Sequence, residues 1–479
     1  MSAARQKGAS DPDRPEATAE RSARSFPGDQ QVLRASARER LAAGRGLRHK
    51  VPRSAHGEWS PPPRRADPIE LLERSDRGRL NELLPIRYAR MKKSPFAFYR
   101  GAAEIMAWDL ARTPVTLLRV QACGDCHIAN FGGFGSPERR LVFDINDFDQ
   151  TLPAPWEWDV KRMAASVVLG GRGLGLRERD CADAARSSAR SYRFHMREYA
   201  QMRALEVWYS HLDAEIFLEE ASSKQSKRMW KAAEREAFRE TAEHVFPKIT
   251  DVRNGLRRIV DEPPLIYHPR DFKRRSALVE DMFRRYRLTL PEEKRVILDR
   301  YEIVDMARKV VGVGSVGTRC AAMLLMAGND DPLFLQFKEA TRSVLEPYAG
   351  ASHYHNHGQR VVTGQRMLQS VSDVFLGWTR DDEGRDYYFR QLRDMKMKID
   401  LDGMSKTEWF EYVEICGWAL ARAHARTGDP AKIGGYLGKG EAFDEAIGSF
   451  AAAYADQTER DYGELLKAIR AGRIPAETQ

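Results

Sequence analysis

The most constraining stretch of the sequence lies between residues 122 and 149, where polar residues and glycines interrupt short apolar runs. It begins Ala-Cys-Gly-Asp-Cys-His-Ile-Ala-Asn-Phe-Gly and ends Leu-Val-Phe-Asp-Ile-Asn-Asp-Phe-Asp. Asp125 and Asn130 stand five positions apart, with His127 between them. A pattern of this kind predicts two polar loops, each attached to a short buried strand.

The second of these loops supplies further carboxylates. The apolar run 141–143 leads directly into Asp144, and Asp147 follows it. Phosphoryl transfer uses one carboxylate to orient the attacking hydroxyl, and an amide with a second carboxylate to hold Mg²⁺ on the phosphates. We therefore interpret Asp125 as the orienting base and Asn130 as a metal ligand, with Asp144 or Asp147 as the metal-binding acid. Asp144 has the better spacing.

A glycine motif stands later in the chain, at Gly312, Gly314 and Gly317, with Ser315 between the last two. Its backbone would approach phosphates, and Lys338 on a following strand would pair with them. A dinucleotide-binding interpretation competes, because residues 309–327 also fit a strand, a turn and a helix, and Glu339 stands where such a fold needs an acid. A packing or turn role for the glycines is a third interpretation.

The segment 124–130, Gly-Asp-Cys-His-Ile-Ala-Asn, resembles the catalytic loop of the aminoglycoside-phosphotransferase and choline-kinase branch of the protein-kinase-like superfamily. The resemblance implies that Asp125 is catalytic. We interpret His127 as bracing the loop by a hydrogen bond, with a role as a base as the alternative. It also favours Asp147, which Phe148 and a further acid follow, as the metal ligand. Asp159, in the helix that comes next, matches an aspartate that supports this loop from beneath.

The order of the segments is unusual for that superfamily. The catalytic loop and its bracing helix come first, the glycine motif and Lys338 come later, and a Leu-Ala-x-x-His helix ending near His424 comes last. Joined end to end, these segments stand in kinase order. We therefore expect an α+β, helix-rich, two-lobed kinase-like fold that is circularly permuted, which neighbouring surface termini make feasible.

The chain from about residue 85 to 470 also resembles the bacterial family called domain of unknown function 2252. Its signatures match residues 90–101, the 122–149 segment and residues 311–317. That family name implies no reaction.

Composition divides the chain. Residues 1–65 hold 14 Lys and Arg against 7 Asp and Glu, so they carry +7 of the net charge of +9. Few apolar residues stand there, which predicts a disordered basic arm, and its aromatic residues, Phe26 and Trp59, do not form an interleaved surface for stacking on nucleic acid. We expect helical segments with the catalytic and metal loops over 66–260, an α/β nucleotide-binding part over 261–400, and a helical completion over 401–479.

The sequence favours a cytoplasmic enzyme with ATP and Mg²⁺ as cofactors and an unidentified small-molecule or protein acceptor. No run of eighteen apolar residues occurs, so we expect no membrane span, and the five cysteines fit reduced thiols. An NAD(P)-binding oxidoreductase and a non-catalytic kinase-like binding protein are the alternatives. The acid that pairs with Lys338 is left open, since Gln365 and Gln369 occupy the helix where a glutamate is expected.

Overall fold

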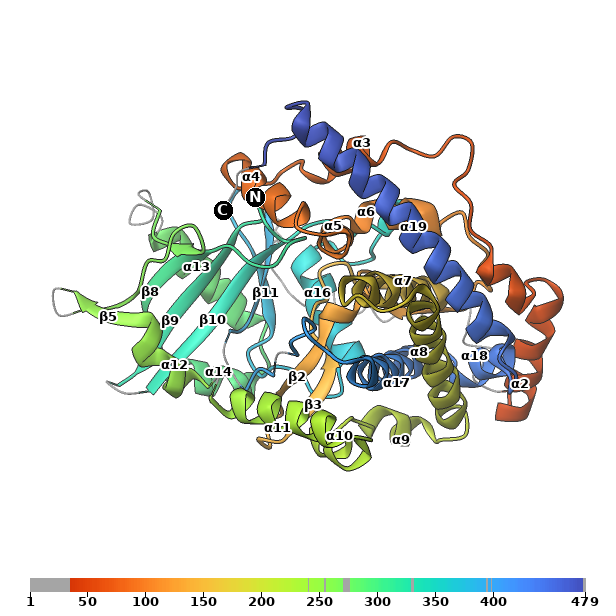
Figure 1. The fold of residues 1–479 in the computed structure, drawn as a ribbon. Coiled ribbons are helices and arrows are strands. Elements are labelled where there is room, and N and C mark those ends of the chain that lie inside the picture. The colour runs from red at the N-terminus through yellow and green to blue at the C-terminus, as the bar shows by residue number, and fades with distance from the viewer. Residues whose placement is uncertain are drawn as a thin grey trace, which may run out of the picture.

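The computed structural model describes residues 35–239, 241–253, 256–269, 276–328, 331–392, 395–397 and 399–476. It is an α+β structure in which a six-stranded sheet stands beside a larger group of helices (Figure 1). We call residues 242–392 the sheet region, and residues 35–239 together with 399–476 the helical region. No helix in the described ranges combines the length and the apolar character needed to cross a membrane.

The main sheet is antiparallel throughout, with the strand order β11-β12-β10-β9-β8-β7. Its central strands are rich in apolar residues that are buried on both faces, as an internal strand requires. The strands are β7 (Ile266–Tyr267), β8 (Glu302–Lys309), β9 (Cys320–Ala327), β10 (Asp331–Ala340), β11 (Gly377–Arg380) and β12 (Asp386–Gln391).

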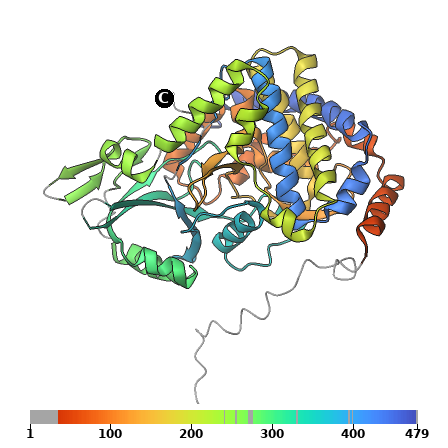
Figure 2. The same cartoon turned by 90° about the horizontal axis from the view of Figure 1, so that it is seen from below.

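Helices cover both faces of this sheet (Figure 2). On one face lie α13 (Ser276–Leu288) and α14 (Glu292–Leu298), where Tyr286 stacks on Phe389 with 4.1 Å between ring centroids. On the other lie α12 (Ala242–Ile249) and the hairpin of β5 (Thr250–Arg253) and β6 (Leu256–Ile259). These last elements precede the expected boundary at residue 260 and yet pack on the sheet.

Long helices build the helical region, with α17 against α8, and α19 lying across α7 and α8 (Figure 1). A capping box of Ser405 and Glu408 starts α17. Trp156 and Tyr192 stack in the core with 5.6 Å between centroids. The long helices are α7 (Trp156–Gly173), α8 (Glu178–Tyr199), α17 (Lys406–Thr427) and α19 (Ala442–Arg470), and the short α18 (Pro430–Leu437) packs against α8.

Two short antiparallel strand pairs carry the 122–149 segment between the two regions. β1 (Arg119–Ala122) pairs with β4 (Leu152–Pro155), and β2 (Phe131–Gly135) pairs with β3 (Leu141–Ile145). The shorter helices around them are α3 (Pro68–Ser75), α4 (Leu84–Met91), α5 (Pro95–Gly101), α6 (Ala103–Leu110), α9 (Ala204–Tyr209), α10 (Ala214–Glu220), α11 (Lys224–Arg239), α15 (Glu346–Ala349) and α16 (His357–Leu368).

The predicted disordered arm is too long. Residues 1–34 lie outside the described residues, but α2 (Ala37–Gly46) and the 3₁₀ helices η2 (Leu47–His49) and η3 (Arg53–Gly57) follow. Arg65 donates hydrogen bonds of 2.7 Å to both Asp109 and Asp461. Composition could not predict this order, because the residues that fix the segment are distant in sequence.

The residues after the glycine motif do not form the helix that the dinucleotide-binding interpretation expects. A dinucleotide-binding site needs a helix there, whose N-terminal N–H groups receive the pyrophosphate. The chain instead forms β9, which pairs antiparallel with β8 and β10. The strand–turn–helix interpretation is therefore wrong, and the glycine motif is a loop between two antiparallel strands.

Candidate functional site

The first polar loop leaves β1 through a turn that only glycine fits. Gly124 has a φ of +84°, and a Cβ atom there would lie 2.3 Å from the carbonyl oxygen of Gln150. Left-handed backbone is readily adopted by glycine and strained for other residues. The turn sends Asp125 and His127 out of the strand into a cleft between the helical and sheet regions.

Asp125 is held by an arginine from α7. Arg162 Nε donates to Asp125 Oδ1 at 2.7 Å, and Arg162 NH2 donates to the carbonyl oxygen of Tyr99 at 3.1 Å. Burial raises the pKa of the Asp125 carboxyl above its usual range, although Arg162 acts in the opposite direction. A carboxylate with a raised pKa is better matched to accepting a proton near neutral pH.

Asn130 and His127 complete this loop. Asn130 Nδ2 donates to the carbonyl oxygen of Asp125 at 2.7 Å. Its Oδ1 receives no hydrogen bond from the described residues. The His127 ring is buried, and its Nδ1 has no hydrogen-bond partner there. Burial, with Arg100 and Arg162 nearby, lowers the pKa of His127 well below its usual value, so the ring is neutral at pH 7.

Asp159 lies beneath the loop rather than in the cleft. Its two carboxylate oxygens accept hydrogen bonds from the N–H groups of Cys123 at 2.6 Å and Gly124 at 3.0 Å. His424 Nε2, from α17, lies 3.2 Å from the same carboxylate. Asp159 therefore positions the backbone that carries Asp125, and α17 supports Asp159 through His424.

Asp144 is also remote from the cleft. It is fully buried, and both of its oxygens lie within 2.8 Å of Arg422 NH2. The backbone N–H of Ser370 donates to it at 2.9 Å as well. This environment fits a structural ion pair and does not suit the metal-ligand role for which the sequence slightly favoured Asp144.

Asp147 does line the cleft, together with Asp125 and Asn130. Its Oδ1 accepts one local hydrogen bond, from the backbone N–H of Asp149 at 3.1 Å. The other carboxylate oxygen receives no hydrogen bond from the described residues. Of the two acids proposed as metal ligands, the one with the closer local resemblance is thus the one that lines the cleft together with Asn130.

Asp149 is the acid that pairs with Lys338. The Lys338 ammonium donates to Asp149 Oδ2 and, at 2.6 Å, to the hydroxyl of Ser315. Tyr388 donates to the other Asp149 oxygen at 2.8 Å. Although burial opposes it, Lys338 and these hydrogen bonds hold the pKa of Asp149 below its usual value. Sequence reasoning missed this pair because it sought a glutamate on α16, whereas Asp149 stands at the end of the catalytic segment itself.

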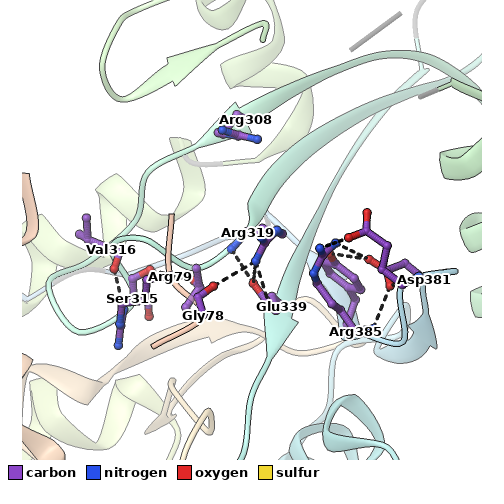
Figure 3. Close-up of polar contacts among 12 residues, drawn as sticks. Gly78, Arg79, Arg308, Ser315, Val316, Arg319, Glu339, Asp381 and Arg385 are labelled. Atoms are coloured by element: carbon purple, nitrogen blue, oxygen red, sulfur yellow. Dashed lines mark hydrogen bonds and ion pairs between the residues drawn. The ribbon is translucent and has the colours of Figure 1, made fainter. Parts of the chain in front are cut away.

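The glycine loop joins β8 to β9, and Gly312, Gly314 and Ser315 line the cleft. Gly317 has a φ of +91° and packs against Arg79. Arg79 donates to the carbonyl oxygen of Val316 at 2.5 Å, which ties the loop to the N-terminal helices (Figure 3). The backbone N–H groups of Gly314 and Ser315 have no partner among the described residues, so they are available to an anion.

Glu339 has a structural partner. Its carboxylate lies 3.1 Å from Arg319 NH1, and the same guanidinium donates to the carbonyl oxygen of Gly78 (Figure 3). This pairing leaves it unsuited to the ribose-binding role that the dinucleotide interpretation gave it.

A third wall of the cleft comes from residues that the sequence did not single out. Arg79, Arg87, Arg100 and Glu104, from α3 to α6 and their connections, line the same cleft as the 125–130 loop and the glycine loop, and the open volume of this cleft is about 850 Å³. Arg100 belongs to the 90–101 signature, so the arginines of that signature could have indicated this wall of the cleft from the sequence.

The side-chain oxygens of Asn130 and Asp147, which line the same cleft, are the hard ligands that Mg²⁺ takes. Over the described ranges, no group of three or more His, Cys, Asp or Glu side chains is arranged as a metal site. Mg²⁺ is commonly bound by one or two carboxylates together with substrate phosphates, so it does not need such a group. The residues present fit a cation that is shared with a phosphate ligand.

Comparison with known families covers almost all of this architecture. The family described as "Uncharacterized protein conserved in bacteria (DUF2252)" matches residues 79–468. The chain belongs to this family. The DUF2252 match spans the N-terminal wall of the cleft, the catalytic and glycine loops, and His424. No curated protein and no solved structure matches the chain.

Proposed function

We propose that this DUF2252 protein is an ATP- and Mg²⁺-dependent phosphotransferase that acts on a hydroxyl group. One observation carries the proposal: Asp125, Asn130 and Asp147 line the same cleft as the glycine loop, whose Ser315 is bonded to Lys338. A catalytic carboxylate, an amide and acid for metal, and a glycine loop with a lysine are the recurring parts of kinase sites.

The topology of the sheet region supports a kinase-like fold. A strand, the glycine loop, a second strand and a third strand with Lys338 follow one another along the chain as β8, β9 and β10. α16 and two more strands come next. Kinases likewise place the lysine on the third strand, before the helix that orients it.

The contacts of α17 support the proposed circular permutation. Tyr412 donates to the carbonyl oxygen of Ile128 at 2.6 Å, and His424 contacts Asp159. This helix, which follows the catalytic loop by almost 280 residues, thus packs directly on that loop, where a kinase in the usual order would have a helix that comes before it.

The cleft residues then divide the reaction among them. The acceptor oxygen attacks the γ-phosphorus of ATP while Asp125 takes the proton of the hydroxyl. The bond from the γ-phosphorus to the bridging oxygen breaks, and its electron pair remains on the β-phosphate of ADP. Lys338 and the free N–H groups of the glycine loop would hold the phosphates. Mg²⁺ on Asn130 and Asp147 would neutralise phosphate charge.

The test compares the thermal unfolding of the protein with ATP, with ATP plus MgCl₂, and with NADPH. A ligand at about a hundredfold its dissociation constant adds roughly 2.7 kcal/mol, which is readily seen. We expect stabilisation by ATP that Mg²⁺ enlarges, and none by NADPH. Stabilisation by NADPH alone, or by no nucleotide, would contradict the proposal.

Turnover separates an enzyme from a binding protein. ADP release is measured with a panel of hydroxyl compounds for the wild type, for Asp125→Asn and for the control Glu236→Gln on α11. We expect Asp125→Asn to lose turnover by at least about a hundredfold while it still binds ATP, and the control to behave as wild type. Nucleotide binding with no turnover in the wild type would favour the non-catalytic alternative.

A further inference from the structure

Arg100 occupies a central place in the cleft. It stands in the last turn of α5, and its guanidinium is near Asp125 and Asp147. Its backbone carbonyl oxygen lies 3.0 Å from the position that a Cβ of Gly314 would occupy, so the tip of the glycine loop rests against it. Arg100 is therefore next to both the catalytic loop and the phosphate-binding loop.

The guanidinium of Arg100 has no hydrogen-bond or ion-pair partner within the described part of the chain. Its Nε is buried and unpaired. Its guanidinium carbon lies 5.9 Å from the centroid of the Phe96 ring. Burial lowers the pKa of Arg100, and the nearby Asp125 and Asp147 oppose that effect. Arginine stays protonated in proteins, so this is a half-buried cation with unused donors.

The other arginines of the cleft are engaged. Arg79 donates to the carbonyl oxygens of Ser75 and Val316. Arg87 donates to Asp76, to the Ser75 hydroxyl and to the carbonyl oxygen of Gly101.

The remaining basic groups offer no free charge to the catalytic loop either. Lys338 is paired with Asp149, and Arg162 is paired with Asp125. His127 is neutral at pH 7. Arg100 is the one side chain beside Asp125 that can offer an uncommitted positive charge among the described residues.

We propose that Arg100 is a further catalytic residue, which binds the oxygens of the phosphoryl group as it passes from ATP to the acceptor. This proposal rests on the proposed phosphotransferase function. In the transfer, negative charge spreads over the three equatorial oxygens while the bond to ADP breaks and the bond to the acceptor forms. The forked donors of a guanidinium match that arrangement of oxygens. The proton goes to Asp125, so Arg100 only stabilises charge.

Two variants test the role. Arg100→Met keeps an unbranched apolar stem and removes the charge, and Arg100→Lys keeps the charge without the fork. Arg112→Met, an exposed position in the same N-terminal segment, is the control. We expect Arg100→Met to lower kcat for ADP release at least about a hundredfold with the KM for ATP changed less than about threefold, because a phosphoryl-contacting arginine acts on the transition state. Arg100→Lys should recover part of the loss.

A second measurement does not depend on turnover. ADP, MgCl₂ and aluminium fluoride together mimic the phosphoryl group in the transition state of its transfer. The wild type should therefore unfold at a higher temperature with all three than with ADP and MgCl₂ alone. Arg100→Met should lose this extra shift and keep the shift caused by ADP and MgCl₂. Wild-type turnover in Arg100→Met, or an undiminished fluoride shift, would overturn the role of Arg100 alone. A wild type that binds neither ATP nor ADP would overturn the phosphotransferase as well.

Discussion

The 122–149 segment has a buried side and a cleft side, and the two are built in opposite ways. On the buried side, the Asp144 carboxylate is occupied by Arg422 and the N–H of Ser370, and the segment's own N–H groups at 123 and 124 are bound by Asp159 of α7. On the cleft side, Asn130 and Asp147 keep oxygen atoms without partners among the described residues. The comparison teaches that acids a few positions apart in one loop can serve different ends, some fixing its shape and others remaining free for a ligand.

The largest expected effect concerns Asp144. Its replacement by Ala would leave the Arg422 charge buried and unpaired, which costs about 3–5 kcal/mol of the free energy of unfolding. Asp147→Ala, only three positions away, should change it by no more than about 0.5 kcal/mol. Urea unfolding of both variants measures the difference. Equal losses would show that the two sides of the segment do not differ in this way.

Asp159→Ala should have the next largest effect. It removes a charged acceptor from the N–H groups of Cys123 and Gly124, and a hydrogen bond to a charged group is worth about 1.5–3 kcal/mol. Because those N–H groups set the path of the loop, the variant should also lose ATP turnover. A stable variant that is fully active would place Asp159 outside the support of the loop.

Acid sensitivity offers a third test, since two buried histidines resist protonation. Burial, together with Lys161, lowers the pKa of His56 to about 3, and His127 is also depressed. The unfolded chain takes up these protons near pH 6.5 and the folded chain does not, so the stability they contribute is present above that pH and is lost as pH falls. Between pH 6 and 5 His56 should cost about 1 kcal/mol, and His127 should add to that loss.

His127→Gln separates the two contributions. Its free energy of unfolding should fall less steeply than that of the wild type between pH 6 and 5, because one fewer buried histidine resists the proton. His355→Gln, at an exposed position, is the control and should keep the wild-type slope. Identical slopes for all three proteins would show that the ring on the cleft side does not resist protonation.

Asp147→Asn should have the smallest effect on stability, and its effect on ligand binding should be specific to Mg²⁺. The variant should unfold within about 0.5 kcal/mol of the wild type, since its carboxylate supports little of the fold. ATP should still stabilise it, but MgCl₂ should no longer enlarge that stabilisation. Arg112→Met serves as the matched control. An unchanged Mg²⁺ effect would remove Asp147 from the proposed metal site.

What the sequence predicts well is local. The short spacing from Asp125 to Asn130 brings both to one loop, and apolar runs such as 333–338 and 387–392 become β10 and β12. Residues 320–327 are ambiguous, because alanine, methionine and leucine are strong helix formers. Pairing with the two neighbouring strands outweighs that preference in the folded chain.

What the sequence could not supply are partners from distant segments. Asp144 is next to an apolar run whether it binds metal or an arginine, and only the arrival of Arg422 decides between the two. The pairing of Lys338 with Asp149, and the approach of Arg100 to the glycine loop, likewise depend on how three separate segments meet. None of these contacts leaves a periodic signal in the sequence.

The pairing of Asp144 with Arg422 also has a consequence for how the protein folds as it is synthesised. The two residues are 278 positions apart. At about 5–20 residues per second, the ribosome needs roughly 15–55 s to make the second after the first. Throughout that interval the acid has no counter-charge and must stay in water, so the loop around it cannot close. The catalytic segment is among the first parts of the folded body to be synthesised and, for this reason, among the last to reach its final shape.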